Sequence, residues 1–134
     1  MRNIIVCMAL LLVSFVVRGQ SSNNVYSVIT LTPFKVVNGE AIKGETESVM
    51  GSRTVTITNE MIKVVDKKAN NVITFFIENT YSESPTKRYY YCSFLGQHNA
   101  ARITKTDDEI GISTLLFECE GQEVKYIYTI LPVD

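Results

Sequence analysis

The chain of 134 residues has no tryptophan, one histidine, three cysteines and three prolines. A single histidine excludes a histidine-rich zinc site. The sequence also lacks a glycine-rich phosphate loop and a nucleophile elbow. Basic residues occur only in small pairs, whereas nucleic acids and anionic membranes attract larger basic clusters. The sequence therefore gives no positive evidence for an enzyme, for a metal or other cofactor, or for nucleic-acid binding.

The beginning of the sequence has the pattern of an export signal. Arg2 supplies a positive charge, residues 4–17 are almost entirely apolar, and small side chains precede a cut after Gly19. The apolar run is shorter than the ~20 residues that a transmembrane helix needs. We predict that residues 1–19 are a cleaved signal peptide. Residues 20–134 then form one secreted or periplasmic domain without a membrane span.

Cleavage after Gly19 changes both the charge and the cysteine count of the chain. Its 13 basic and 14 acidic residues become 11 and 14, which is a net charge of −3. Cys7 leaves with the signal, and the first mature residue is no cysteine, so we expect no lipid anchor. Cys92 and Cys119 remain, and an even pair in an exported domain is a disulfide candidate. Two buried free thiols are the alternative.

The hydrophobic pattern has a period of two along nearly the whole mature chain. In residues 54–58, Val55 and Ile57 share one face and three threonines share the other. Branched and aromatic side chains dominate the remaining apolar runs, which favours strands. We predict strands over residues 54–58, 72–78, 88–95, 112–119 and 124–131, and weaker ones over 25–37, 61–66 and 100–106. Because no window of eleven residues has a convincing helical period, the fold class is all-β.

Polar breaks suited to turns separate these runs. Short ones at residues 59–60, 67–71, 96–99 and 121–122 are suited to hairpins. Residues 79–87, which contain Pro85, and residues 106–111 are longer connections. Residues 38–53 hold three glycines and three glutamates, and we expect a surface loop there, with a helical turn as the alternative.

Seven to eight strands with short links predict a mainly antiparallel sheet. Several strands, such as residues 124–131, are apolar on both faces, so an open flat sheet would expose apolar surface and edges. We therefore expect a small barrel or a two-sheet sandwich. In a strict meander, one strand would separate Cys92 from Cys119 by about 9.5 Å, beyond the ~7 Å that a disulfide allows. A bond between them would thus exclude a plain meander.

Three polar groups are weak candidates for chemistry. His98 lies in a turn sequence with no evident nucleophile beside it. The acidic run 107–109 lacks the alternating ligand spacing of a calcium loop and fits a solvated turn. Glu118 and Glu120 share one strand face, as outward-facing acids commonly do.

Tyrosines are the residues of this sequence that most favour a binding role, because each combines a large apolar body with a polar tip. The ligand or interface candidates are Tyr89, Tyr90, Tyr91, Tyr126 and Tyr128. The first hypothesis is an exported, non-catalytic domain that binds a macromolecule at an edge or a tyrosine-bearing face. The second is a small calycin-like barrel that carries an apolar small molecule. A secreted hydrolase is a distant third.

Overall fold

The computed structural model describes residues 24–133. The predicted signal peptide, residues 1–19, lies outside the described residues. Within them, no helix has the length and apolar character needed to cross a membrane. Ten strands account for most of this part of the chain: β1 (Val25–Val37), β2 (Glu40–Lys43), β3 (Glu47–Ser48), β4 (Arg53–Ile57), β5 (Met61–Asp66), β6 (Asn71–Ser84), β7 (Lys87–Phe94), β8 (Gln97–Asp107), β9 (Ser113–Cys119) and β10 (Val124–Pro132).

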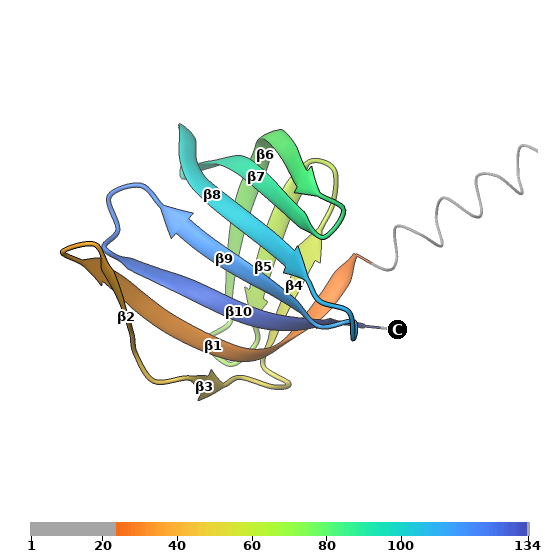
Figure 1. The fold of residues 1–134 in the computed structure, drawn as a ribbon. Helices are drawn as coiled ribbons and strands as arrows, with labels where there is room; N and C mark the ends of the chain where they lie inside the picture. The colour runs from red at the N-terminus through yellow and green to blue at the C-terminus, as the bar shows by residue number, and fades with distance from the viewer. Residues whose placement is uncertain (1–23, 134) are drawn as a thin grey trace, which may run out of the picture.

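Eight of these strands form a closed antiparallel barrel (Figure 1). Strands β4 to β10 pair with their sequence neighbours, and β1 pairs with both β4 and β10. The pairing of β1 with β10 closes the sheet, which removes its two edges. The predicted all-β, mainly antiparallel fold is confirmed, and of the two expected architectures the barrel is the one observed.

Strand β1 is long enough to serve three neighbours along one edge. Its first residues pair with β4, its middle with β3 and its last with β2, while β10 occupies the opposite edge. A bulge places Ile29 opposite no residue of β10, between the pairs Val28–Ile130 and Thr30–Thr129. The carbonyl of Ile29 accepts a hydrogen bond from Val49 N at 3.0 Å. The bulge therefore anchors the segment that follows β3.

The expected surface loop over residues 38–53 is wrong in part, because β2 and β3 lie within it. The side chains of both strands are exposed, and main-chain hydrogen bonds to β1 hold the strands in place. Short polar strands of this kind carry no strong period-two pattern, so propensity alone missed them. Asn38 and Gly39 adopt positive φ values of 53° and 81° in the turn before β2. This is the conformation that a two-residue hairpin turn requires.

Other strand boundaries extend beyond the predicted ones. β6 continues to Ser84, through most of the expected connection 79–87, and β8 begins at Gln97 inside the expected turn 96–99. Only Leu95 and Gly96 remain between β7 and β8, both with positive φ.

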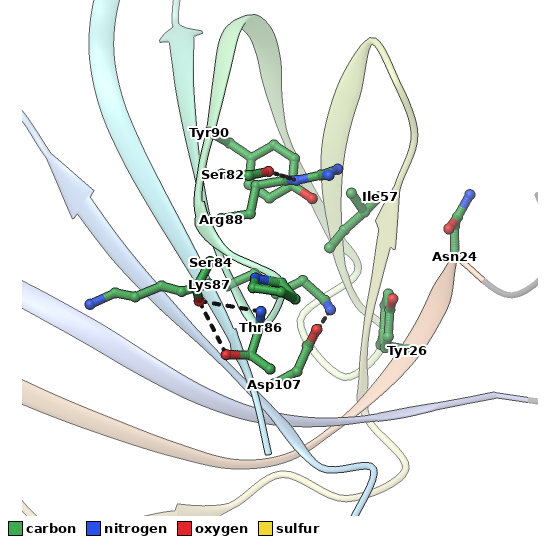
Figure 2. A pocket seen from close by; sticks show the side chains of 12 residues that line it. Asn24, Tyr26, Ile57, Ser82, Ser84, Thr86, Lys87, Arg88, Tyr90 and Asp107 are labelled. Atoms are coloured by element: carbon green, nitrogen blue, oxygen red, sulfur yellow. Dashed lines mark hydrogen bonds and ion pairs between the residues drawn. The ribbon is translucent and has the colours of Figure 1, made fainter. Parts of the chain in front are cut away.

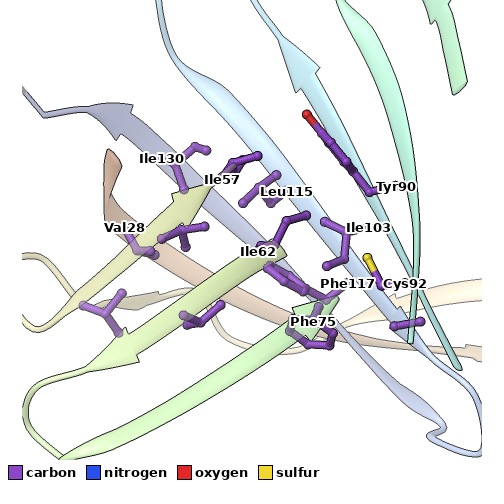
Figure 3. Packing of buried hydrophobic residues seen from close by; sticks show 14 residues of the cluster. Val28, Ile57, Ile62, Phe75, Tyr90, Cys92, Ile103, Leu115, Phe117 and Ile130 are labelled. Carbon is purple, nitrogen blue, oxygen red and sulfur yellow. The ribbon is translucent and has the colours of Figure 1, made fainter. Parts of the chain in front are cut away.

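Apolar side chains fill the middle of the barrel (Figure 3). Seven side chains there are fully buried: Ile62, Ile103, Leu115, Ile130, Val28, Val55 and Cys92. An eight-stranded barrel encloses just enough space for its inward side chains, so such filling is expected.

Cys92 and Cys119 are free thiols, so the candidate disulfide is not formed. Both cysteines pair with Ala101, which lies on β8 between their strands β7 and β9. Next-nearest strands are about 9.5 Å apart, which is too far for a disulfide. The strands here thus follow the plain meander, and the two thiols are free, which is the alternative to the disulfide that the sequence left open.

Free thiols have a direct chemical readout. In denaturant and without prior reduction, iodoacetamide should alkylate both cysteines of the purified domain that begins at Gln20. In the folded protein Cys92 should resist alkylation, because burial raises its pKa to about 12 and the thiolate is the reactive form. Intact-mass spectrometry measures both states. A mass two hydrogens low that resists alkylation until reduction would contradict the strand order.

Candidate functional site

Two open depressions lie at opposite ends of the barrel, with the filled core between them. Two strands reach from one depression to the other. β4 places Arg53 in one and Ile57 in the other, and β1 places Leu31 with Arg53 and Tyr26 with Ile57. The two ends differ in chemistry.

The first depression, called here the aromatic mouth, is defined by Phe75, Phe94, Phe117, Tyr126 and Tyr128. It encloses about 430 Å³. Ring centroids are 4.8 Å apart for Phe75 and Phe94 and 5.6 Å apart for Phe75 and Phe117. Phe117 and Tyr128 follow at 4.7 Å. Four rings thus form one continuous wall with the spacing that aromatic pairs prefer.

A polar corner ends this wall. Arg53 donates from Nη2 to Asp66 at 2.8 Å and from Nη1 to the Tyr128 hydroxyl at 3.2 Å. Its guanidinium carbon lies 5.6 Å from the centre of the Tyr128 ring. The Arg53 Nε group is buried and has no hydrogen-bond partner in the described chain. Both terminal nitrogens of Arg53 are therefore hydrogen-bonded, and only its buried Nε group is left unsatisfied.

The pKa values of Asp66 and Tyr128, the two partners of Arg53, shift in opposite directions. The hydrogen bond from Arg53, assisted by the Ala69 and Lys68 amides, lowers the pKa of Asp66. Burial raises the pKa of Tyr128, although the nearby Arg53 charge opposes this shift. At neutral pH the aspartate is thus ionised and the phenol is neutral.

The second depression, called here the cationic mouth, is defined by Tyr26, Arg88, Tyr90, Lys105 and Asp107 and encloses about 440 Å³ (Figure 2). The hairpin that joins β6 to β7 covers one side of it. Lys105 donates to Asp107, and its ammonium lies 5.5 Å from the centre of the Tyr26 ring.

The structure divides the five predicted tyrosines among three places. Tyr126 and Tyr128 lie together in the aromatic mouth, and Tyr90 lies in the cationic mouth. Tyr89 and Tyr91 point outward, since successive residues of a strand alternate between its faces. On the outside, Tyr89 stacks on Tyr81 with a centroid distance of 6.1 Å. Whether any of the five binds a ligand stays a prediction.

His98 and the acidic run 107–109 make hydrogen bonds to other residues of the described chain. His98 and the amide of Asn99 both contact the Glu78 carboxylate. His98 and Asp107 lie near opposite ends of β8, roughly 30 Å apart by the rise of a strand. Asp108 accepts hydrogen bonds from the amides of Ile110 and Ile112, which is the arrangement of a turn. The structure does not bring His98 and the acidic run together.

Glu118 also has a structural environment, on the outer face of β9. Its carboxylate binds Arg102 at 2.8 Å and Lys125 at 2.9 Å. Burial opposes ionisation, but these two cations hold the pKa of Glu118 below its ordinary value. A carboxylate held ionised in this way is unsuited to act as a general acid.

Sequence reasoning missed the cations Arg53 and Lys105 of the two mouths. It assigned Asp107 to a solvated turn, whereas Asp107 lines the cationic mouth and binds Lys105 and Ser113. Arg53 and Lys105 sit at strand positions whose faces turn inward near the barrel ends. The position of Arg53, two residues before the inward Val55, is the signal that could have found it. Nothing in the sequence alone distinguishes Lys105 from an outward lysine.

Within residues 24–133, no group of three or more histidine, cysteine, aspartate or glutamate residues could hold a metal ion. Comparison of the chain with protein-family models, with curated proteins and with solved structures gives no match.

The Arg53–Asp66 pair predicts a specific acid dependence. Because the folded state lowers the pKa of Asp66 below 3.8, its stabilisation is complete above about pH 5 and is lost as the pH falls through the lowered pKa. Asp66→Asn should be less stable than the parent at pH 7 and should lose less stability between pH 4 and pH 2. Urea unfolding at each pH measures this. Glu123→Gln, which removes a carboxylate from the exposed β9–β10 turn, is the control. Equal acid slopes in the parent and in Asp66→Asn would contradict the prediction.

Proposed function

We propose that this domain is an exported, non-catalytic binding barrel that takes one small, largely apolar molecule in the aromatic mouth. The single observation that carries the proposal is the continuous aromatic wall of Phe94, Phe75, Phe117 and Tyr128 around an open space. The assignment to export rests on the N-terminal sequence pattern alone.

The size of the aromatic mouth supports a small ligand. Pockets for small molecules span roughly 300–1,000 Å³, and the 430 Å³ here lies near the lower end. The core beneath it is filled, with Ile62, Ile103 and Leu115 fully buried. A long acyl chain would have to displace these side chains. The proposed ligand is therefore compact, about the size of one or two fused rings.

The chemistry of the lining supports an apolar ligand with a polar group at one end. Apolar and aromatic side chains make up most of the lining, and Leu31, Val64 and Ile73 extend the aromatic wall. Burial of apolar ligand surface contributes about 25 cal/mol per Å² before the costs of association. The Tyr128 hydroxyl and the Arg53–Asp66 pair supply the polar contacts that fix orientation.

Binding of a macromolecule on the outer surface is the second candidate function. The stacked pair of Tyr81 and Tyr89 favours it, because Tyr81 is 58% exposed. Exposed tyrosines are enriched at protein interfaces. We rank it second because this pair projects from a convex outer wall, whereas the aromatic mouth is concave.

The test uses the neutral fluorescent probe N-phenyl-1-naphthylamine, whose emission rises in apolar surroundings. The parent domain should bind one probe molecule saturably. Tyr126→Ala should weaken binding roughly fivefold to tenfold, because one aromatic contact is lost. Tyr81→Ala, which removes an exposed tyrosine from the outer face, is the matched control and should bind like the parent.

Circular dichroism and thermal unfolding first establish that each variant is folded. Binding by the parent that Tyr126→Ala reduces and Tyr81→Ala leaves intact supports the proposal. Absence of saturable binding would contradict it, as would equal effects of the two substitutions. A larger effect of Tyr81→Ala would favour the outer surface instead.

A further inference from the structure

The cationic mouth is a second cavity, which the proposed function does not use. It lies at the end of the barrel opposite the aromatic mouth, and the two share no lining residue. Its volume of about 440 Å³ is that of a small-molecule site. Its lining is mostly polar, with hydroxyl, amide and charged side chains, so its ligand must differ in class from that of the aromatic mouth.

Positive charge exceeds negative charge in this mouth. Lys105 points inward from β8 with its side chain only 15% exposed. It shares Asp107 with Ser113, whose hydroxyl donates to the same carboxylate at 2.6 Å. Burial opposes ionisation of Asp107, but these hydrogen bonds and the charges of Lys105 and Arg88 lower its pKa. One ionised carboxylate thus faces two cations.

A third lining cation belongs to the outer surface. The ammonium of Lys87 lies 3.5 Å from Glu83 and 5.6 Å from the centre of the Tyr89 ring. Figure 2 shows it pointing away from the cavity. It is therefore left out of the charge balance of the mouth.

Arg88 supplies hydrogen-bond donors that the described chain does not use. Its Nε donates to the Ser82 hydroxyl at 3.1 Å, which fixes the direction of the guanidinium. Neither terminal nitrogen has a hydrogen-bond acceptor among residues 24–133. Figure 2 shows the guanidinium beside the Tyr90 hydroxyl, on the side that faces Ile57. A neighbouring depression of about 350 Å³ is also lined by Arg88, Tyr90 and Ile57, so these donors lie between two open spaces.

We propose that the cationic mouth binds the oxyanion group of a small ligand, a carboxylate or a phosphate. The planar fork of Arg88 matches two oxygens of such a group, and the Tyr90 hydroxyl and the Lys105 ammonium supply further donors. The low exposure of Lys105 strengthens its attraction for an anion relative to a lysine in bulk water. Asp107 holds Lys105 in place and prevents a larger unbalanced charge when the mouth is empty.

The experiment is a titration followed by two-dimensional ¹H–¹⁵N NMR of the whole domain from Gln20. Sodium phosphate and sodium acetate are the two probes, and sodium chloride at equal ionic strength is the reference. Saturable shifts should appear at the amides of Lys105 and Tyr90 and at the Arg88 side-chain Nε. Saturation by phosphate alone identifies a phosphate site, and saturation by acetate alone identifies a carboxylate site.

Two variants and one control locate the site. Arg88→Gln should weaken binding of the effective probe about tenfold, which corresponds to loss of a charged hydrogen bond. Tyr90→Phe should weaken it about threefold while retaining the buried ring. Arg102→Gln, which removes an arginine from the outer face, should bind within twofold of the parent. Shifts no larger than those in chloride would overturn the proposal, and so would equal losses in Arg88→Gln and Arg102→Gln. Neither result affects the proposed binding in the aromatic mouth, which the neutral probe tests separately.

Discussion

The pairing of the first described strand with the last is the constraint on which the rest of the structure depends. Register from Tyr26–Pro132 to Lys35–Val124 joins β1 to β10 over nearly their full lengths. This ladder closes the ribbon of hairpins into a barrel whose eight strands have no free edge. It also decides which face of every strand is interior. The buried core and the two mouths both follow from that closure.

Closure also explains why the barrel has two shallow sites rather than one deep cavity. In the middle of the eight-stranded barrel, apolar side chains occupy the interior, and Val28, Ile62 and Leu115 are among those fully buried. Near the strand ends the inward side chains line the two open depressions, so inward positions there can carry charge. Arg53 with Asp66 at one end and Lys105 with Asp107 at the other are ion pairs on otherwise apolar faces. Such local departures from the hydrophobic pattern are expected where a protein binds something.

The strands were predictable because period two with branched and aromatic residues is a strong local signal. Residues 61–66 were predicted with the boundaries of β5, and residues 25–37 with those of β1. β2 and β3 were missed because their side chains are exposed and only β1 specifies them. Barrel versus sandwich was undecided because the β1–β10 contact spans the whole chain and leaves no local trace. For the same reason the sequence identified Tyr126 and Tyr128 as binding candidates but not Arg53 as the hydrogen-bond partner of Tyr128.

The closure of the barrel by β1 and β10 is the central claim, and nuclear Overhauser contacts between these strands test it most directly. In ¹³C- and ¹⁵N-labelled protein, cross-strand contacts should join Val28 to Ile130 and Leu31 to Tyr128. The amides that form this ladder should also exchange slowly with solvent. Absence of these contacts, together with fast exchange along both strands, would show an open sheet and contradict the account of the core and of both mouths.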